Sequence, residues 1–333
     1  MQIAVLGAGA WGTALAIALA SKHEVALWGR DAQQLAAISA SRKNEKYLPD
    51  ITLSPSIQIA THPADVISQA DLALVATSTS GLVETVKLVQ AWRTNSRPVL
   101  PIVWACKGFD KTTGKLPHES IAPIVPAGSF FGALSGPSFA DEVARGLPCA
   151  LTLAANDITF AAALAAQLNN PALRVYSSAD LVGVELGGAL KNVMAIAAGI
   201  SDGMQLGLNA RAALITRGLA EIVRLGVAMG GKPETFMGLT GMGDLILTAT
   251  GNLSRNRKVG ILLAEGKPID IILRDLGHVA EGVNSAASAL ALARQYKVSM
   301  PITEAVNAVL FHHASPRDAL NALLSREAKV ESF

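Results

Sequence analysis

The sequence has little of what would stabilise a secreted scaffold, a metal centre or a nucleic-acid-binding surface. It contains two cysteines, Cys106 and Cys149, in 333 residues, and no close spacing of cysteine and histidine. This excludes a disulfide framework and a cysteine-based metal site, and it favours a reducing cytoplasm. Charged residues make up only 16% of the chain, and the formal net charge is +2. We therefore expect no general positive field for nucleic acid, and any anion site must be local.

Two long runs without charge resemble membrane segments at first sight. Residues 3–21 are interrupted by glycines and have no Lys or Arg before them, which argues against a signal peptide or a spanning helix. Residues 120–140 contain Pro123, Pro126 and Pro137, which a bilayer-spanning helix does not accommodate. We expect no stable membrane insertion. The length predicts two domains, each with its own core.

The opening stretch has the order strand, glycine turn, helix. The apolar residues 3–6 predict a buried parallel strand, and an Ala- and Leu-rich helix follows the sequence GAGAWG. In such a turn the first glycine allows a tight reversal, the second lets backbone approach a pyrophosphate, and the third lets helix and strand pack closely. The N–H groups of the first helical turn then face the anion. The candidate cofactor-binding residues here are Gly7, Gly9, Ala10, Trp11 and Gly12.

The end of the second predicted strand, Glu24–Gly29, bears on the choice of dinucleotide. An acidic residue roughly 20 positions after the glycines holds the ribose 2′-hydroxyl of NAD, whereas arginine accommodates the 2′-phosphate of NADP. This chain has Arg30 followed by Asp31. The pattern predicts use of NADP or NADPH and leaves NAD or NADH possible. A solvated arginine without such a role is the alternative.

Strand and helix patterns alternate through the first half, which predicts a doubly wound α/β sheet. Residues 44–51 are predicted to form a loop because they are polar and contain a proline. Ligands of such sheets lie beyond the carboxyl ends of the strands, so residues 77–80 and 106–108 should face the cofactor. Further strands are predicted at Ile57–Ala60, Leu72–Ala76, Val99–Ala105, Leu151–Ala154 and Arg174–Ser177, and helices at Ala32–Ser41, Pro63–Gln69, Leu82–Trp92 and Phe160–Leu168.

Three residues near the ends of these strands are candidates for substrate contact. Lys107 places a cation beside Gly108, although an ordinary surface lysine is the alternative. In the loop after residue 134, Gly136 allows close approach of a ligand. Ser138 is predicted to cap the helix that begins near Phe139, and such a cap can also bind an anion.

From residue 184 onward the pattern changes to long helices, so we predict a first domain at 1–183 and an all-helical second domain at 184–333. The predicted helix at 184–200 is nearly apolar but contains Lys191 and Asn192. Burial disfavours the charged form of lysine and lowers its pKa, which favours proton exchange near neutral pH. A structural ion pair of Lys191 with Glu185 or Asp202 is the alternative.

A second polar cluster lies at residues 238–260. Gly241 and Gly243 precede Asp244, and the sequence SRN at 254–256 opens a predicted helix. A serine cap, free N–H groups and a guanidinium at one point are suited to binding a phosphate. Arg257 and Lys258 are predicted to lie on the solvated side of this helix.

With these motifs in place, almost the whole chain resembles one family, the bacterial NAD(P)-dependent glycerol-3-phosphate dehydrogenases. The most specific matches are VELGGALKNVMAIAAGISDG at 184–203 and GMGDLILTATGNLSRNRKVG at 241–260. Further matches are GAGAWGTALA at 7–16, LWGR at 27–30, YLPDI at 47–51, WACKG at 104–108 and SGPSFADEVARGLP at 135–148.

The resemblance implies a Rossmann-type sheet followed by a helical domain, and reversible reduction of dihydroxyacetone phosphate to sn-glycerol 3-phosphate for phospholipid synthesis. It also implies a homodimer. Lys191 would exchange the proton. The substrate would contact Lys107, Gly136, Ser138, Lys191, Asp244, Ser254, Arg255 and Asn256. Beyond the glycine turn, the cofactor would contact Arg30, Lys107, Ala140, Arg255, Val279 and Glu281.

Two other functions remain open from the residues alone. A reductase of 2-hydroxy acids or of the ketopantoate type would share the fold, but it would need a carboxylate pocket and would leave the cluster at 254–256 unexplained. A non-catalytic NAD(P)-sensing module would bind the cofactor without turnover.

Overall fold

The structure is a computed structural model that describes residues 1–93, 99–276 and 280–326. The chain folds into two compact units. The first comprises Met1–Cys106 and Pro117–Leu181, and the second comprises Lys107–Leu116 and Val182–Phe333. The short segment 107–116, which lies within the first half of the sequence, is therefore part of the second unit.

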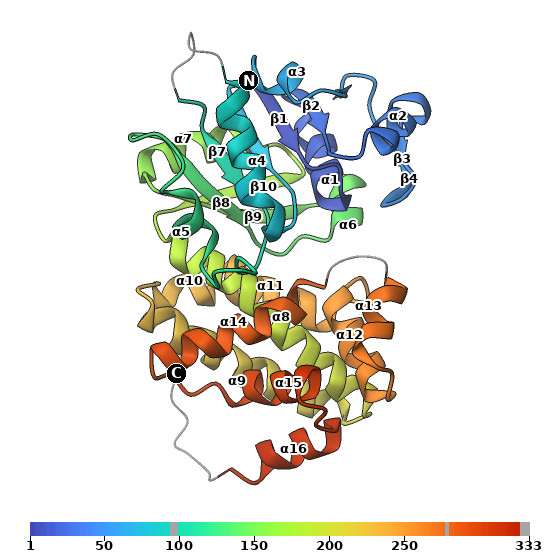
Figure 1. Ribbon diagram of the computed structural model, residues 1–333, viewed down its shortest axis with the longest axis vertical. Coiled ribbons are helices and arrows are strands. Elements are labelled where there is room, and N and C mark those ends of the chain that lie inside the picture. Colours follow the sequence, from blue (N-terminus) through green and yellow to red (C-terminus); the bar gives the residue numbers. More distant parts are fainter. Residues whose placement is uncertain (94–98, 277–279, 327–333) are drawn as a thin grey trace. The chain divides into compact units, whose positions relative to one another are not determined.

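The first unit is built on an eight-stranded sheet with the order β10-β9-β8-β7-β6-β1-β2-β5. Neighbouring strands are parallel except for β8 and β9, which are antiparallel. Figure 1 shows α4 in front of this sheet. The predicted Rossmann-type architecture is confirmed. The strands are β1 (Gln2–Leu6), β2 (Glu24–Trp28), β5 (Gln58–Ile59), β6 (Leu72–Val75), β7 (Ile102–Trp104), β8 (Phe131–Ser135), β9 (Cys149–Ala155) and β10 (Leu173–Ser178).

The helices of this unit begin close to the predicted positions. Asp31 caps α2 by accepting hydrogen bonds from the N–H groups of Gln33 and Gln34, and Asp157 caps α7 by accepting one from that of Phe160. Each carboxylate satisfies backbone donors that the helix leaves open at its start. The helices are α1 (Ala10–Leu19), α2 (Ala32–Ser41), α3 (Ala64–Ile67), α4 (Thr79–Trp92), α5 (Pro117–Ile121), α6 (Ala140–Ala144) and α7 (Ile158–Leu168).

Two features of this unit differ from the sequence-based expectation. The predicted loop at 44–51 was wrong, because β3 (Lys43–Asn44) and β4 (Leu48–Thr52) pair as a small antiparallel sheet. Pro49 is compatible with this pairing since the sheet has only two strands, and each is an edge. Strand β8 had no counterpart in the prediction, because residues 120–140 have several prolines and no strong alternation.

The second unit is organised around α8 (Leu181–Gly203), and residues 183–199 of this helix are all buried. It is the one helix in the described residues that is long and apolar enough to cross a membrane, yet 89% of its most apolar window is buried within the protein. A core helix surrounded by other helices needs this composition. It contacts α9 (Gly207–Ala228), α11 (Asp244–Thr250), α12 (Arg255–Ala264) and α14 (Glu281–Gln295). Helix α15 (Pro301–Phe311) packs against α14.

One hydrophobic cluster joins these helices to the excursion at 107–116. Phe109 and Leu116 are 4% and 1% exposed and belong to the same cluster as Leu190 and Val193 of α8. These apolar anchors hold the segment that carries Lys107 against α8. The remaining helices of the unit are α10 (Pro233–Met237), the π-helix η1 (Leu239–Gly243), α13 (Ile269–Leu276) and α16 (Pro316–Leu324).

Candidate functional site

The glycine turn has the geometry that its spacing predicts. Gly7 has a φ of +128°, and a Cβ there would lie 2.7 Å from the carbonyl group of Ala76, at the end of β6. A Cβ on Gly12 would lie 1.9 Å from the carbonyl oxygen of Gly7, so α1 packs directly on the turn. At Gly9 a Cβ would meet nothing within 4 Å. The turn therefore leaves open space at its second glycine, where a pyrophosphate would approach the start of α1.

A buried asparagine that the sequence analysis missed braces this turn. Asn44 is 0% exposed, and its Nδ2 donates hydrogen bonds to the carbonyl oxygen of Ala8 at 3.0 Å and to Oγ1 of Thr13 at 2.8 Å. Gln34 of α2 donates to the same carbonyl oxygen at 2.8 Å and to Oδ1 of Asn44 at 3.1 Å. No local signal marks Asn44, since its partners lie far away in the sequence.

Trp11 and Ala140 lie against one apolar cluster, although they are far apart in the sequence. The cluster contains Leu48 and Val143 among its buried members. The indole Nε1 of Trp11 is buried and has no hydrogen-bond partner among the described residues. An orphaned donor beside an open glycine turn fits a dinucleotide, whose phosphates and ribose supply acceptors.

The two residues after β2 have different surroundings. Both Arg30 and Asp31 are exposed. Oδ1 of Asp31 accepts hydrogen bonds from the N–H groups of Gln33 and Gln34 at 3.1 and 3.0 Å. One oxygen of this carboxylate is thus already used as a helix cap, which reduces its capacity to accept from a ribose hydroxyl.

The loop after β8 differs in one respect from the prediction. Gly136 has a φ of +141°, and a Cβ there would lie 3.0 Å from the carbonyl oxygen of Ala150. The prediction that Ser138 caps the next helix was wrong, because the N-cap residue is Phe139 and no side chain caps α6. Ser138 instead donates from Oγ to the carbonyl oxygen of Gly136 at 2.9 Å, since the chain starts the helix one residue later.

In the second unit, Lys191, Lys107 and Asp244 come together. Lys191 on α8 donates from Nζ to Oδ1 of Asp244, and Lys107 donates to Oδ2 of the same carboxylate at 2.7 Å. The side chains of Lys191, Lys107 and Asp244 are 9%, 15% and 1% exposed. One buried carboxylate thus orients two ammonium groups side by side. The alternative pairing of Lys191 with Asp202 is not observed, because Asp202 is held by two arginines, as described below.

The surroundings of Lys191 shift its proton affinity. Burial lowers the pKa of Lys191 to about 8, the nearby Lys107 adds to this effect, and the charge of Asp244 opposes it. Near neutral pH the group carries a proton but gives it up far more readily than an ordinary lysine. Such a group can serve as acid in one direction of a reaction and as base in the other.

Thr248 is a further member of this cluster that the sequence analysis missed. Its Oγ1 accepts a hydrogen bond from Nζ of Lys191 at 2.9 Å and donates to the carbonyl oxygen of Asp244 at 2.6 Å. The spacing of four residues from Asp244 on α11 was an available signal. Immediately before α11, the π-helix η1 fits closely against α8, since a Cβ on Gly187 would lie 2.7 Å from the carbonyl oxygen of Thr240.

The start of α12 is tied to α8 and α14. Ser254 is the N-cap, as predicted, and its Oγ accepts from the N–H of Arg257 at 3.2 Å. Asn256 donates from Nδ2 to Oδ1 of Asn192 at 2.9 Å and accepts from the N–H of Gly282 at 3.1 Å. Arg255 is exposed. These contacts place the start of α12 beside Asn192, which follows Lys191, and beside Gly282, which follows Glu281. The candidate residue Val279 lies outside the described residues.

One residue of this cluster was misplaced by the prediction. Arg257 does not lie on the solvated side of α12, because its Nε donates to Oδ2 of Asp202 at 2.7 Å and its side chain is only 15% exposed. Arg211 of α9 contacts the same carboxylate at 3.1 Å. The exposed residue of the predicted pair is Lys258 alone.

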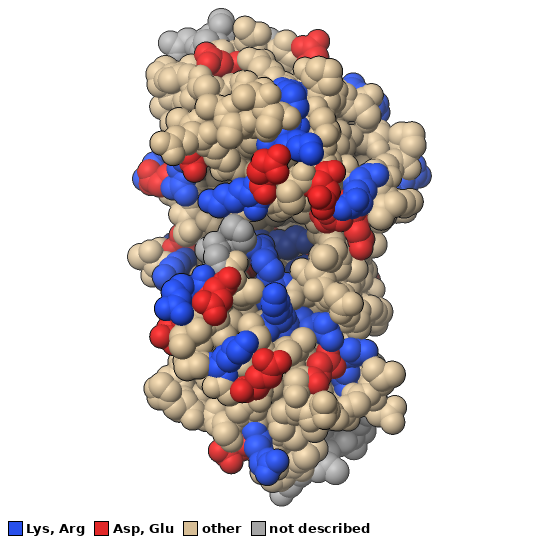
Figure 2. All heavy atoms as spheres, turned by 90° about the vertical axis from the view of Figure 1, so that its right-hand side faces the viewer, with Lys and Arg blue, Asp and Glu red and all other residues tan. Residues whose placement is uncertain are grey.

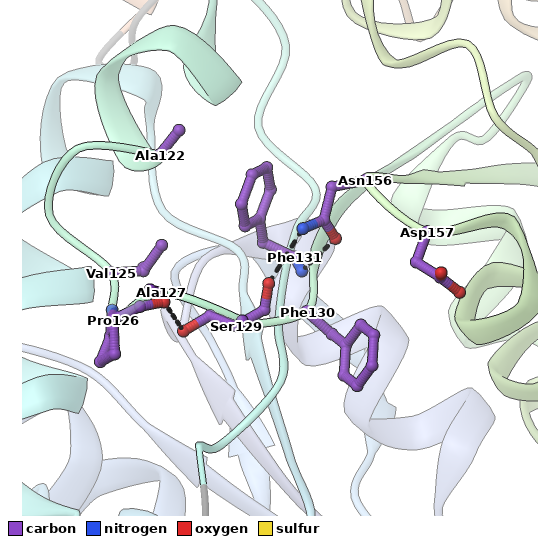
Figure 3. A pocket seen from close by; sticks show the side chains of 10 residues that line it. Ala122, Val125, Pro126, Ala127, Ser129, Phe130, Phe131, Asn156 and Asp157 are labelled. Atoms are coloured by element: carbon purple, nitrogen blue, oxygen red, sulfur yellow. Dashed lines mark hydrogen bonds between the residues drawn. The ribbon is translucent and has the colours of Figure 1, made fainter.

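A cavity of about 390 Å³ lies elsewhere in the first unit, at the amino-terminal end of β8. Figure 3 shows that the Asn156 amide bridges two backbone groups beside it, donating to the carbonyl oxygen of Ser129 at 2.9 Å and accepting from the N–H of Phe131 at 3.0 Å. Ser129 Oγ donates to the carbonyl oxygen of Pro126. These polar groups already bond to the backbone of the protein. The cavity lies at the amino-terminal end of β8, whereas the glycine turn follows the carboxyl-terminal end of the parallel strand β1.

Figure 2 shows Lys and Arg interspersed with Asp and Glu on the face it draws of each unit. Among residues 1–93, 99–276 and 280–326, no group of three or more His, Cys, Asp or Glu residues could hold a metal ion.

Comparisons with known proteins agree along the whole chain. Residues 2–161 match the family model described as the NAD-dependent glycerol-3-phosphate dehydrogenase N-terminus, and residues 180–321 match that of the C-terminus. Proteins named glycerol-3-phosphate dehydrogenase (NAD(P)+) are similar to the chain. That of Aromatoleum aromaticum is 54% identical over 99% of this chain and 100% of its own, and that of Thiobacillus denitrificans is 53% identical over the same shares. A crystal structure of glycerol-3-phosphate dehydrogenase from Coxiella burnetii matches with a TM-score of 0.91 at 38% identity, covering 97% of this chain and 98% of that one.

Proposed function

The chain belongs to the NAD-dependent glycerol-3-phosphate dehydrogenase family, and we propose that it reduces dihydroxyacetone phosphate reversibly to sn-glycerol 3-phosphate. The observation that carries this proposal is the ammonium of Lys191, buried and hydrogen-bonded to Asp244 and Thr248, with Lys107 on the other oxygen of the same carboxylate. The cofactor is NAD or NADP, which supplies or accepts a hydride when bound.

Lys191 would exchange the proton that accompanies hydride transfer. In ketone reduction the carbon at C2 gains the hydride and its oxygen gains a proton, which Nζ of Lys191 would donate. In alcohol oxidation the neutral amine would take the hydroxyl proton. Asp244 would hold Lys191 and Lys107 in place, and the charge of Lys107 would stabilise the developing negative oxygen.

The phosphate of the substrate would be held by the first turn of α12. Ser254 as cap, the open N–H groups, the guanidinium of Arg255 and the amide of Asn256 offer donors to a dianion. A charge-assisted hydrogen bond contributes roughly 1.5 to 3 kcal/mol, so two or three suffice for a small phosphoester. Gly136 and Ser138 of the first unit are proposed as further substrate contacts.

The cofactor would bind along the glycine turn of the first unit. Gly7, Gly9, Ala10, Trp11, Gly12 and Ala140 are proposed contacts, with Lys107, Arg255, Val279 and Glu281 from the second unit. We propose that residues 1–183 form the nucleotide-binding domain, that 184–333 form the substrate-binding domain, and that Lys107 contacts both ligands.

Preference for NADP would depend on Arg30. Because Asp31 caps α2, the guanidinium of Arg30 is the better placed of the two to meet a 2′-phosphate. Initial rates with both cofactors on wild type and Arg30→Ala test this. We expect KM for NADPH to rise about tenfold while KM for NADH stays the same. Equal losses with both cofactors would refute the assignment.

The overall function is tested by following NADH or NADPH absorbance with dihydroxyacetone phosphate, using Lys191→Ala as the matched variant. We expect substrate-dependent oxidation in wild type and a loss of at least about 10²-fold in the variant. Turnover of a 2-hydroxy acid instead would favour the reductase alternative. Cofactor binding without turnover of any substrate, unaffected by Lys191→Ala, would favour the sensing module.

We also propose a cytoplasmic setting for the enzyme. Two isolated cysteines suit a reducing cytoplasm, and the product suits supply of glycerophospholipid synthesis. We propose a homodimer, which the molecular mass in solution would test.

A further inference from the structure

Helices α8 and α12 touch through their backbones at a pair of glycines. A Cβ on Gly199 would lie 2.0 Å from the carbonyl oxygen of Arg257, and one on Gly260 would lie 2.1 Å from that of Ile196. Contact this close is possible only for residues without a side chain. The crossing therefore brings residues 257–260 of α12 into direct backbone contact with α8.

A glycine crossing does not by itself fix how the two helices are turned. Interdigitating side chains normally set the angle between packed helices, and two glycines contribute none. The buried Val259 of α12 lies in the same apolar cluster as the side chains of α8. Two polar links add to this packing at the first turn of α12. Asn256 bonds to Asn192 at 2.9 Å, and Arg257 bonds to Asp202 at 2.7 Å. Asn192 and Asp202 are about 15 Å apart along α8 at the usual rise per residue, so the two links run from adjacent residues in the first turn of α12 to two well-separated points on α8.

The directions of Arg257 and Arg255 are coupled by the geometry of α12. Successive residues of an α-helix are turned by about 100°, so Arg255 lies about 200° from Arg257 around α12. With Arg257 fixed to Asp202 on one side, Arg255 is directed to the other side, where it is exposed. Rotation of α12 about its own axis would turn both arginines together.

The Asp202 pair is sheltered enough to act as such a link. Both side chains are 15% exposed, and Nε and Nη2 of Arg257 each lie 2.7 Å from Oδ2. Asp202 also receives Arg211 of α9 at 3.1 Å, although that side chain is 22% exposed. The carboxylate thus joins three helices, and only the Arg257 contact reaches α12.

We propose that Asp202 is a positioning residue for phosphate recognition: through Arg257 it sets the rotation of the first turn of α12 and so aims Arg255 and the open N–H groups at the phosphate. The proposal rests on the function proposed above, since it takes dihydroxyacetone phosphate as the ligand of this turn. Asp202 itself touches no substrate atom in this scheme.

The test compares substrates with and without the phosphate. For Asp202→Asn and Arg257→Gln we expect KM for dihydroxyacetone phosphate to rise about tenfold, because the donors are misdirected. The value of kcat at saturation, KM for the nucleotide, and kcat/KM for unphosphorylated dihydroxyacetone should stay within about twofold of wild type. Inorganic phosphate should inhibit these variants less than it inhibits wild type. Arg257→Lys should recover part of the loss, since it keeps the charge but not the two-point contact.

Arg211→Gln is the matched control, because it removes a guanidinium from the same carboxylate and leaves the Arg257 link. We expect its KM for dihydroxyacetone phosphate to be unchanged. An equal rise in Arg211→Gln, an equal loss for both substrates in Asp202→Asn, or no change in KM would each overturn the proposal. If Asp202→Asn does not fold, Arg257→Lys replaces it in the test. A rise in its KM for dihydroxyacetone phosphate, without a change in kcat/KM for dihydroxyacetone, would support the proposal. Wild-type protein inactive on dihydroxyacetone phosphate would refute the proposed function instead.

Discussion

The pH above which kcat/KM for ketone reduction falls, here called the alkaline limb, should shift in opposite directions when the two charges next to Lys191 are removed one at a time. Ketone reduction needs the ammonium form of Lys191, so kcat/KM in that direction should fall above a pH of about 8 in wild type. Asp244→Asn removes the charge that raises this pKa, and the limb should move to lower pH. Lys107→Gln removes a charge that lowers the pKa, and the limb should move to higher pH.

The size of the first shift follows from the contact distance. Two unit charges about 4 Å apart interact with about 4 kcal/mol at an effective dielectric of about 20, which corresponds to about three pKa units at 1.36 kcal/mol each. Water and the new amide compensate part of this energy, so we expect a downward shift of at least about one unit for Asp244→Asn. The shift for Lys107→Gln should be smaller, because the charge of Lys107 affects Lys191 less than that of Asp244 does.

The assay is the pH dependence of kcat/KM for dihydroxyacetone phosphate reduction between about pH 5.5 and 9.5, which reports groups of the free enzyme. Only the position of the limb is compared, since the variants also lose binding. Lys267→Gln is the control for net charge, because that lysine is 52% exposed and pairs with Glu265 on the surface. A limb that stays in place in both variants, or that moves in the same direction in both, would refute Lys191 as the titrating group.

Two further predictions concern the glycine turn and a buried carboxylate. Gly12→Ala should lower the free energy of unfolding by about 3 kcal/mol or more, because its Cβ would overlap the carbonyl oxygen of Gly7. Gly9→Ala should leave the free energy of unfolding, measured by urea titration, within about 0.5 kcal/mol of wild type. It should nevertheless raise KM for the nucleotide at least about tenfold. Burial raises the pKa of Glu221 to about 7, although Ile302 and Thr303 donate hydrogen bonds to it. Because the pKa of Glu221 is higher in the folded than in the unfolded protein, its contribution to stability is fully present below about pH 4.5 and is lost as the pH rises through 7. The difference in free energy of unfolding between wild type and Glu221→Gln should therefore shrink by up to about 3 kcal/mol between these limits. A difference that grows with pH would contradict this.

Local signals were sufficient wherever one segment carries the whole feature. The strand, glycine turn and helix at residues 2–19 were predictable because each step depends on neighbours in the sequence. The same holds for the Ser254 cap and for a lysine buried in the apolar helix α8. The prediction for Ser138 failed by one residue, since a possible cap in the sequence does not state where the helix begins.

Features that join distant segments could not be predicted in this way. In the small sheet of β3 and β4, Asn44 pairs with Leu48, and its side chain braces a turn formed by the start of the chain. The ion pair of Arg257 was missed because a cation after a helix cap is more often solvated, and only the crossing of α12 over α8 brings it to Asp202.

The sequence by itself therefore determined the class of the first unit, the helical nature of the second, and the candidate residues for dinucleotide, proton and phosphate. These follow from short-range periodicity, glycine spacing and the cost of burying charge. The tertiary structure decided that one carboxylate, Asp244, holds Lys191 and Lys107 together, and that Asp202 holds Arg257. Those contacts depend on how helices far apart in the chain pack, because the free energy of an ion pair is set by distance and burial rather than by order in the sequence.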